Sequence, residues 1–333
     1  MLKKDLGLFI LIVVIATVVA IINPRFLLPI NISNTMNLIG LYGIFSIGIG
    51  LVIITGGIEL SVGSMFALLG VIFVDLLSTY EMNWGLAFIV IVFAGLVLGA
   101  LHGFLVTKMG LQPFIVTLCG LLIYRGVARF YTADGTAGFP FGVTFPELQW
   151  LTTGRTLGVP HSFIAFIVIA VIMAIVLHRS VYGRYLFAVG KNEEAARYSG
   201  IRTQRIIASA YIISGALAGL AAVFFAMYTR SISPATHGNF YELYGIAAAV
   251  LGGCSLRGGE GSILGIVLGT ILLQVLQNLV NLLGIPSSLN FAVIGAVILF
   301  GVLADQQIAR HGGISAIFRR QPAIPVAAEK KSA

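Results

Sequence analysis

Long apolar runs separated by short polar or basic stretches dominate this chain. Candidate membrane-spanning helices lie at about 6–22, 36–54, 62–79, 84–106, 113–131, 162–178, 206–228, 240–254, 262–283 and 288–303. The run at 240–254 is short for a full crossing, and polar and glycine residues interrupt the run at 113–131, so either could be re-entrant or tilted. The pattern predicts an all-α integral membrane protein with about ten transmembrane helices, some of them broken or re-entrant.

Composition supports this class of protein. Hydrophobic residues make up 58% of the 333 residues and charged residues only 10%, which is too little polar surface to cover a soluble globule. The net charge of +8 comes from basic residues in short loops and tails, which indicates topology signals and contact with anionic lipid rather than with nucleic acid. Cys119 and Cys254 lie in apolar runs and the five histidines have no ligand spacing, so no disulfide or metal site is indicated.

The distribution of basic residues predicts an orientation. With ten spans, a cytoplasmic N-terminus places most Lys and Arg on the inside and puts the C-terminus there as well. Residues 1–23 have a basic start and an apolar run, but no small-residue cleavage site follows, which predicts a retained first span. Residues 1–320 are expected to form a single transmembrane domain, and 321–333 a disordered cytoplasmic tail.

The stretch 179–205 is strongly basic and lies between two spans, so we expect a cytoplasmic loop. Its middle predicts a short helix, because Asn192 can accept the first free backbone amides and Gly200 can adopt the left-handed conformation that ends a helix. Glu193 and Glu194 complement the positive helix start. A helix of about two turns is marginal alone in water. It is therefore either shaped to dock on a partner or part of a solvated loop that only sets topology.

The segment GKNEEAARYSGI, at 190–201, resembles the coupling loop of the permease subunit in bacterial ATP-binding-cassette importers of the ribose, xylose and arabinose group. In that family the loop sits in a cleft of the ATPase subunit. The resemblance extends from about residue 36 to 304 and includes LQPFIVTLCGLLIYRG and LGGCSLRGGEGSILG. It implies that the ATPase-coupling residues are Gly190, Asn192, Glu193, Glu194, Ala195, Ala196, Arg197 and Gly200.

Glu59 interrupts the apolar sequence in TGGIELSVGSMFALLG, at 55–70. An ionisable side chain near the bilayer centre costs roughly 2.5 kcal/mol or more, so Glu59 should have a partner or face a wet cavity. We expect Glu59 and Ser61 either to line the translocation pathway or to belong to an interfacial loop. The segment resembles the permease family, which most often has Asp in place of Glu59. A weak echo of its glycine pattern recurs at 252–262, and duplicated halves with broken helices are common in transporters.

The run at 262–283 has two different faces. Glycines recur every four residues from Gly261, and four carboxamides lie roughly opposite, at Gln274, Gln277, Asn278 and Asn281. The glycine side permits close helix packing, as do Gly95, Gly99 and Gly103 in the run at 84–106. The amides need hydrogen-bonding neighbours. They are either a wall of a sugar pathway or a set of bonds between helices without solute contact.

Two external connections are expected. Residues 132–161 are rich in Gly and Pro, which predicts an irregular loop. The turn that contains Arg230, His237, Tyr241 and Glu242 is either a solvated connection or a contact for an external binding protein.

Motifs for chemistry are missing from the sequence. Gly190-Lys191 is followed by Asn192 instead of Ser or Thr, and the sequence contains no nucleophile elbow, so we expect a transport subunit that neither binds ATP nor catalyses a reaction. The resemblance implies a separate cytoplasmic ATPase that binds the ATP, a periplasmic or extracellular sugar-binding protein, a second permease chain, and a location in the bacterial inner membrane. No other cofactor, metal or nucleic acid is expected. The alternative is a secondary transporter driven by an ion gradient, with Glu59 as its ion site.

Overall fold

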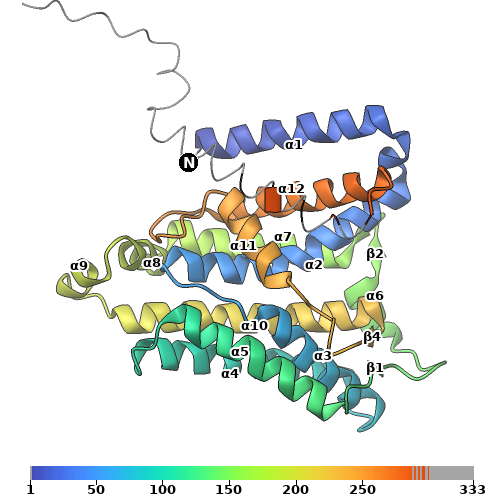
Figure 1. The fold of residues 1–333 in the computed structure, drawn as a ribbon, viewed down its shortest axis with the longest axis horizontal. Coiled ribbons are helices and arrows are strands. Elements are labelled where there is room, and N and C mark those ends of the chain that lie inside the picture. The colour runs from blue at the N-terminus through green and yellow to red at the C-terminus, as the bar shows by residue number, and fades with distance from the viewer. Residues whose placement is uncertain (1, 287–288, 290–291, 293–294, 297–298, 300–333) are drawn as a thin grey trace, which may run out of the picture. The chain divides into compact units, whose positions relative to one another are not determined.

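The computed structural model describes residues 2–286 without interruption, and after them residues 289, 292, 295, 296 and 299. The chain divides into two compact units, Met1–Asn290 and Phe291–Ala333, and nearly all described residues belong to the first. The first unit is a bundle of helices (Figure 1). Its helices are α1 (Leu2–Ile22), η1 (Pro24–Leu27), α2 (Pro29–Ile54), α3 (Val62–Ser78), α4 (Trp84–Thr107), α5 (Pro113–Tyr131), α6 (Pro146–Thr153), α7 (His161–Arg179), α8 (Val181–Lys191), α9 (Glu193–Tyr198), α10 (Thr203–Thr229), α11 (Tyr241–Leu251) and α12 (Ile263–Leu282).

Seven helices of the described residues are long and apolar enough to cross a membrane: α1, α2, α4, α5, α7, α10 and α12. The shorter apolar helices α3 and α11 coincide with two further predicted spans. Each of the first nine predicted segments therefore contains a helix, whereas the tenth, at 288–303, lies mostly outside the described residues. The all-α membrane class is confirmed.

Helix α2 forms the core of the bundle. In its most apolar window 89% of the residues are buried, compared with 11% for α1, and it packs against α7, α10, α11 and α12. Glycines on α2 permit this contact on several sides, since a Cβ on Gly40 would lie 2.3 Å from the backbone of Ser162 and one on Gly48 would lie 2.8 Å from Ser214 Cα. A helix that is apolar all round is typical of such a central position.

The predicted glycine packing is confirmed for α4 and α12. A Cβ on Gly99 would lie 2.3 Å from Tyr211 O of α10, and one on Gly269 would lie 2.1 Å from Ala248 O of α11. In α12 the glycine side therefore faces α11 at van der Waals distance. Small residues allow the backbones of two helices to approach closely. This packing matters in lipid because the hydrophobic effect provides little attraction between helices there.

The connection at 132–161, which the sequence predicts to be external, is more ordered than expected. Within 132–161 the structure contains α6 and three short strands, β1 (Ala137–Gly138), β2 (Arg155–Thr156) and β3 (Val159–Pro160). Strand β1 pairs antiparallel with β4 (Ser231–Ile232), and β2 pairs antiparallel with β3. The prediction of an irregular loop was therefore wrong. Leu148 of α6 is fully buried, so tertiary packing stabilises a helix within a segment that is rich in glycine and proline.

Candidate functional site

The helical structure is interrupted between α2 and α3, and we call the intervening residues the break. Helix α2 ends at Ile54 with Thr55 as its C-cap, and Gly56 has a φ of +84°, a left-handed conformation that favours glycine. Residues 57–61 form no helix or strand, and α3 begins directly after Ser61. Glu59 lies in the middle of this break and is 1% exposed.

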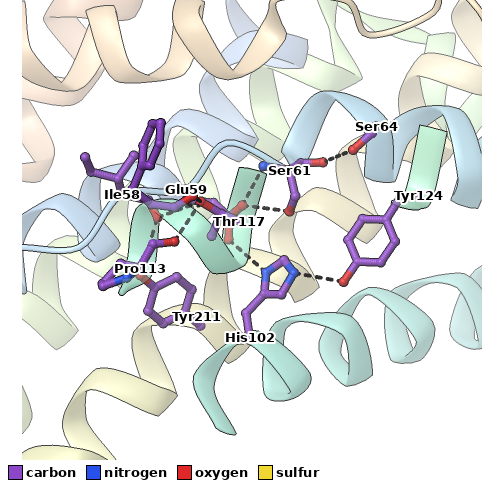
Figure 2. A network of polar contacts seen from close by, with 10 residues as sticks. Ile58, Glu59, Ser61, Ser64, His102, Pro113, Thr117, Tyr124 and Tyr211 are labelled. Carbon is purple, nitrogen blue, oxygen red and sulfur yellow. Dashed lines mark hydrogen bonds and ion pairs between the residues drawn. The ribbon is translucent and has the colours of Figure 1, made fainter. Parts of the chain in front are cut away.

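Backbone and side-chain groups of the protein bond both carboxylate oxygens of Glu59 (Figure 2). Its Oε1 accepts hydrogen bonds from the backbone N–H of Ser61 at 2.8 Å and from the Ser61 hydroxyl at 2.7 Å. Its Oε2 lies 3.3 Å from Nδ1 of His102 in α4. The sequence prediction of a partner for Glu59 is therefore confirmed.

His102 continues the network toward α5. Its Nε2 lies 2.8 Å from the Tyr124 hydroxyl, and the two rings stack with centroids 5.6 Å apart. A neutral imidazole with its hydrogen on Nδ1 donates to Glu59 and accepts from Tyr124, which pairs every donor with an acceptor. We call Glu59, Ser61, His102 and Tyr124 the Glu59 network. It joins the break to α4 and α5 through buried hydrogen bonds.

The carbonyl of Ile58 provides a second attachment of the break. Thr117 of α5 donates its hydroxyl hydrogen to Ile58 O at 3.3 Å, and the Tyr211 hydroxyl of α10 donates to the same oxygen at 3.4 Å (Figure 2). The Ser64 hydroxyl donates to Ser61 O at 2.8 Å. Three surrounding helices therefore hold the conformation of the break.

His102 could not be recognised from the sequence as a member of this network. The five histidines show no ligand spacing, and 43 residues separate His102 from Glu59. One signal was available: an ionisable residue inside an apolar span is rare and usually has a function. Among the described residues, no group of three or more His, Cys, Asp or Glu could hold a metal ion.

The basic stretch 179–205 contains two helices, α8 and α9, where the sequence predicted one. The caps of α9 are confirmed: the Asn192 side chain accepts from Ala195 N at 2.9 Å, and Gly200 has a φ of +83°. Ala196 is buried and Arg197 is exposed, so α9 presents a polar outer surface. The Thr203 hydroxyl of α10 donates to Glu193 at 3.0 Å and fixes the inner side of α9.

A pocket of about 500 Å³ lies beside α9. It is lined by the ends of α2, α4, α5 and α10, with polar groups from Thr107, Gln112, Glu193 and Gln204. Gly56 and Gly57 of the break form another part of its lining. The predicted coupling helix and the break that holds Glu59 therefore border the same space.

The four carboxamides on one side of α12 differ in their hydrogen bonding. Asn278 and Asn31 of α2 exchange two hydrogen bonds, of 2.8 and 3.2 Å, which is the interhelical bonding that the sequence left open. Gln274 is 2% exposed and, in the described part of the chain, neither its amide oxygen nor its nitrogen has a hydrogen-bond partner. Gln277 Oε1 is also buried without a partner there, and Asn281 is exposed.

The turn between α10 and α11 packs against the bundle. Arg125 of α5 donates to Pro234 O at 2.7 Å and to His237 O at 2.6 Å. Glu242 is 7% exposed, and the His237 ring contacts Phe225 and Tyr241. This turn is therefore not a freely solvated connection.

Burial, together with the nearby positive charge of Arg125, lowers the pKa of His237 from 6.5 to about 4. The unfolded chain then binds a proton that the folded chain does not, so stability decreases as pH falls through 6.5 toward 4. We expect the wild-type protein to lose about 2 kcal/mol more stability than His237→Gln between pH 7 and 4.5. Thermal unfolding of the solubilised protein over this range measures the difference. Parallel pH profiles of the two proteins would contradict the assignment.

The proteins to which this chain is similar are permeases. The family model described as branched-chain amino acid transport system / permease component matches residues 31–302. The ribose import permease protein RbsC of Bacillus subtilis (strain 168) is 39% identical over 302 residues, which cover 91% of each chain. RbsC of Escherichia coli (strain K12) is 37% identical over 305 residues, covering 92% of this chain and 93% of that protein. The fructose import permease protein FruF of Bifidobacterium longum (strain NCC 2705) is 32% identical over 335 residues, covering 98% of this chain and 92% of that protein. No solved structure matches the chain significantly.

Proposed function

The chain belongs to the permease family of the branched-chain amino acid transport system, and on this premise we propose that it is the membrane-spanning subunit of an ATP-binding-cassette importer for a monosaccharide. The family description names amino acids, but the relatives with the extensive matches above are named as import permeases for ribose and fructose. Their similarity covers more than nine-tenths of both chains, which supports a sugar as the transported solute. The family is a transport component and not an enzyme.

The exposed helix α9 is the observation that carries this proposal. It is capped at both ends and anchored through Glu193, while Glu194, Arg197 and Tyr198 are exposed. The sequence has no nucleotide-binding loop, so an importer driven by ATP must obtain this energy through a partner chain. A cytoplasmic ATPase that binds ATP and grips α9 meets both requirements, with the coupling residues at 190 and 192–197 and at Gly200.

The assembly follows from the same proposal. Two permease chains enclose a cavity, two ATPase subunits grip their α9 helices, and an external binding protein delivers the sugar. The first residues of α1 lie at the same end of the first unit as α9 (Figure 1), which supports a cytoplasmic N-terminus in the bacterial inner membrane. Ten spans, a transmembrane domain of residues 1–320 and a cytoplasmic C-terminus complete the topology. The tail at 321–333 is outside the described residues.

The translocation pathway is proposed to follow the amide side of α12. Gln274 and Gln277 support this, because the Gln274 amide and the Gln277 oxygen are buried without hydrogen-bond partners in the described residues, and a hydroxyl-rich solute would supply them. Asn278 and Asn281 extend the same side toward the end of the helix. Glu59 and Ser61 do not contact the solute in this proposal, since their polar groups are already bonded to one another. They support the pathway by holding the conformation of the break.

The alternative of a secondary transporter is not favoured. It needs Glu59 to exchange an ion with solvent, whereas Glu59 is 1% exposed and three donors occupy its oxygens. The similar import permeases named above also match the region that contains α9. An uncoupler that abolishes uptake while ATP is maintained would restore this alternative.

Replacing Arg197 and Tyr198 together with alanine tests the docking role of α9. Both side chains are exposed, and the guanidinium of Arg197 lies 6.0 Å from the centre of the Tyr198 ring, so we expect stability to change by no more than about 0.5 kcal/mol. Co-purification of the ATPase and ATP-dependent uptake should both fall about tenfold or more. The exposed Arg25→Ala variant serves as a control that should keep both activities. Unchanged recruitment and uptake in the double variant would exclude docking through this surface.

A further inference from the structure

Three segments that are distant in sequence meet backbone to backbone just before α9. They are the end of α2 at Ile54, the end of α8 at Gly190, and the loop residues Gly258 and Gly259. The Gly259 N–H donates a hydrogen bond to Ile54 O at 2.8 Å. We call these four residues the glycine junction.

The glycine positions of the junction have no room for a side chain. A Cβ on Gly190 would lie 1.9 Å from Ile54 O and 2.5 Å from Gly259 N. A Cβ on Gly258 would lie 2.7 Å from Gly190 O and 2.8 Å from Gly56 N, which belongs to the break after α2. Every one of these contacts is with backbone atoms, so rotation of a flexible side chain cannot relieve it.

The loop side of the junction is a defined turn. Gly258 and Gly259 have φ values of +83° and +74°, a left-handed pair that favours glycine. The loop closes on itself, because Gly258 N donates to Ser255 O at 2.8 Å and Ser255 N donates to Glu260 O at 3.1 Å. At its outer edge, Lys191 Nζ forms an ion pair with Glu260 Oε1 at 3.2 Å.

Helix α9 is joined to the junction without a flexible linker. The N–H of Asn192 donates to Ala188 O at 3.1 Å and caps the end of α8, and the Asn192 side chain caps the start of α9. One residue therefore ends one helix and begins the next. A displacement of α9 reaches Gly190 through two residues whose backbone is hydrogen-bonded.

We propose that the glycine junction transmits movement of α9 to two helix breaks at once, one between α2 and α3 and the other between α11 and α12. These breaks contain the two glycine-rich segments that echo each other in sequence, 56–64 and 252–262. The first leads to the Glu59 network and the second to α12, where the Gln274 amide has no partner within the described part of the chain. The junction residues are positioning residues, and their role rests on the proposed function.

A Gly259→Ala substitution tests the transmission. The added Cβ would lie 2.8 Å from both N and Cα of Lys191, so it forces the loop away from α8. In proteoliposomes with the complete importer and ribose as the solute, we expect the ATPase to remain bound and to hydrolyse ATP. The amount of ribose taken up per ATP should fall roughly fivefold or more. Gly253→Ala is the matched control, because Gly253 lies in the same loop at a φ of +88° and a Cβ there meets nothing within 4 Å.

A cross-link gives a second readout that does not depend on how the alanine variant folds. Cysteines in place of Lys191 and Glu260, in a chain without Cys119 and Cys254, are joined by a reducible bifunctional thiol reagent. Because the junction moves as one piece, the cross-linked importer should keep its ratio of uptake to hydrolysis. Inhibition that a reductant reverses would show relative motion of the two segments and overturn the proposal. So would a Gly259→Ala importer that stays as coupled as Gly253→Ala.

The experiment distinguishes failure of the proposed function from failure of the proposed role of the glycine junction. Lack of ATP-dependent ribose uptake by the wild-type complex would count against the proposed function or its substrate. Full coupling in Gly259→Ala beside an active wild-type complex would remove only the role of the junction.

Discussion

Replacing Glu59 with leucine is expected to lower the free energy of unfolding by about 3–5 kcal/mol, because it removes one partner of a buried polar network. Leucine occupies much of the same space but accepts no hydrogen bond. The Ser61 N–H, the Ser61 hydroxyl and Nδ1 of His102 would lose their acceptor in a site that is closed to water. Thermal unfolding of the solubilised protein measures the loss.

A graded series separates hydrogen bonding from side-chain size. Glu59→Gln keeps an oxygen for Ser61 and presents its amide to His102, whose hydrogen can move to Nε2 and face the Tyr124 hydroxyl. We expect this variant to lose only about 1–2 kcal/mol. Glu147→Leu, at an exposed glutamate, is the control. Equal stability of the leucine variants at 59 and 147 would show that the Glu59 network does not stabilise the fold.

Replacing Gly215 with leucine is expected to cost about 3 kcal/mol, since it separates two helices that touch through their backbones. A Cβ at this position of α10 would lie 2.3 Å from Gly95 O and 2.8 Å from Gly99 Cα of α4. Neither atom can rotate away, so α4 and α10 must move apart along a contact that both helices share. The unfolding temperature should fall and ATP-dependent uptake should be lost with it.

Gly126→Leu is the matched control for this substitution. Gly126 also lies in a spanning helix, α5, but a Cβ there meets no heavy atom within 4 Å. Leucine is favoured over glycine in helices by roughly 0.8 kcal/mol, so this variant should be neutral or slightly stabilised. Equal stability of the two leucine variants would show that the α4–α10 contact tolerates separation.

Features of the fold that depend on neighbouring residues could be predicted from the sequence. The first nine apolar runs coincide with helices, because a helix satisfies its own backbone hydrogen bonds, and seven of these helices are long enough to cross a bilayer. The caps of α9 at Asn192 and Gly200 also follow from local residue types. The α6 helix escaped prediction because its stability comes from burial of Leu148 and not from its own pattern.

The candidate site could be predicted only in part. Glu59 is conspicuous as an acid in an apolar stretch, but its partner His102 comes from another helix. The four carboxamides of α12 share a side in sequence, yet among the described residues only Asn278 has an interhelical partner, and that partner is 247 residues away. The glycine junction similarly joins residues 54, 190 and 258–259, and no local pattern connects them.

By itself, the sequence determined that this chain is a helical membrane protein, that its family is that of transport permeases, and that a short capped helix interrupts its most basic loop. Only the tertiary structure decided which helices touch and which polar groups meet in the break after α2. The reason is that hydropathy and capping act within one helix, whereas the pairing of helices in lipid depends on close packing of small residues and on hydrogen bonds between distant segments.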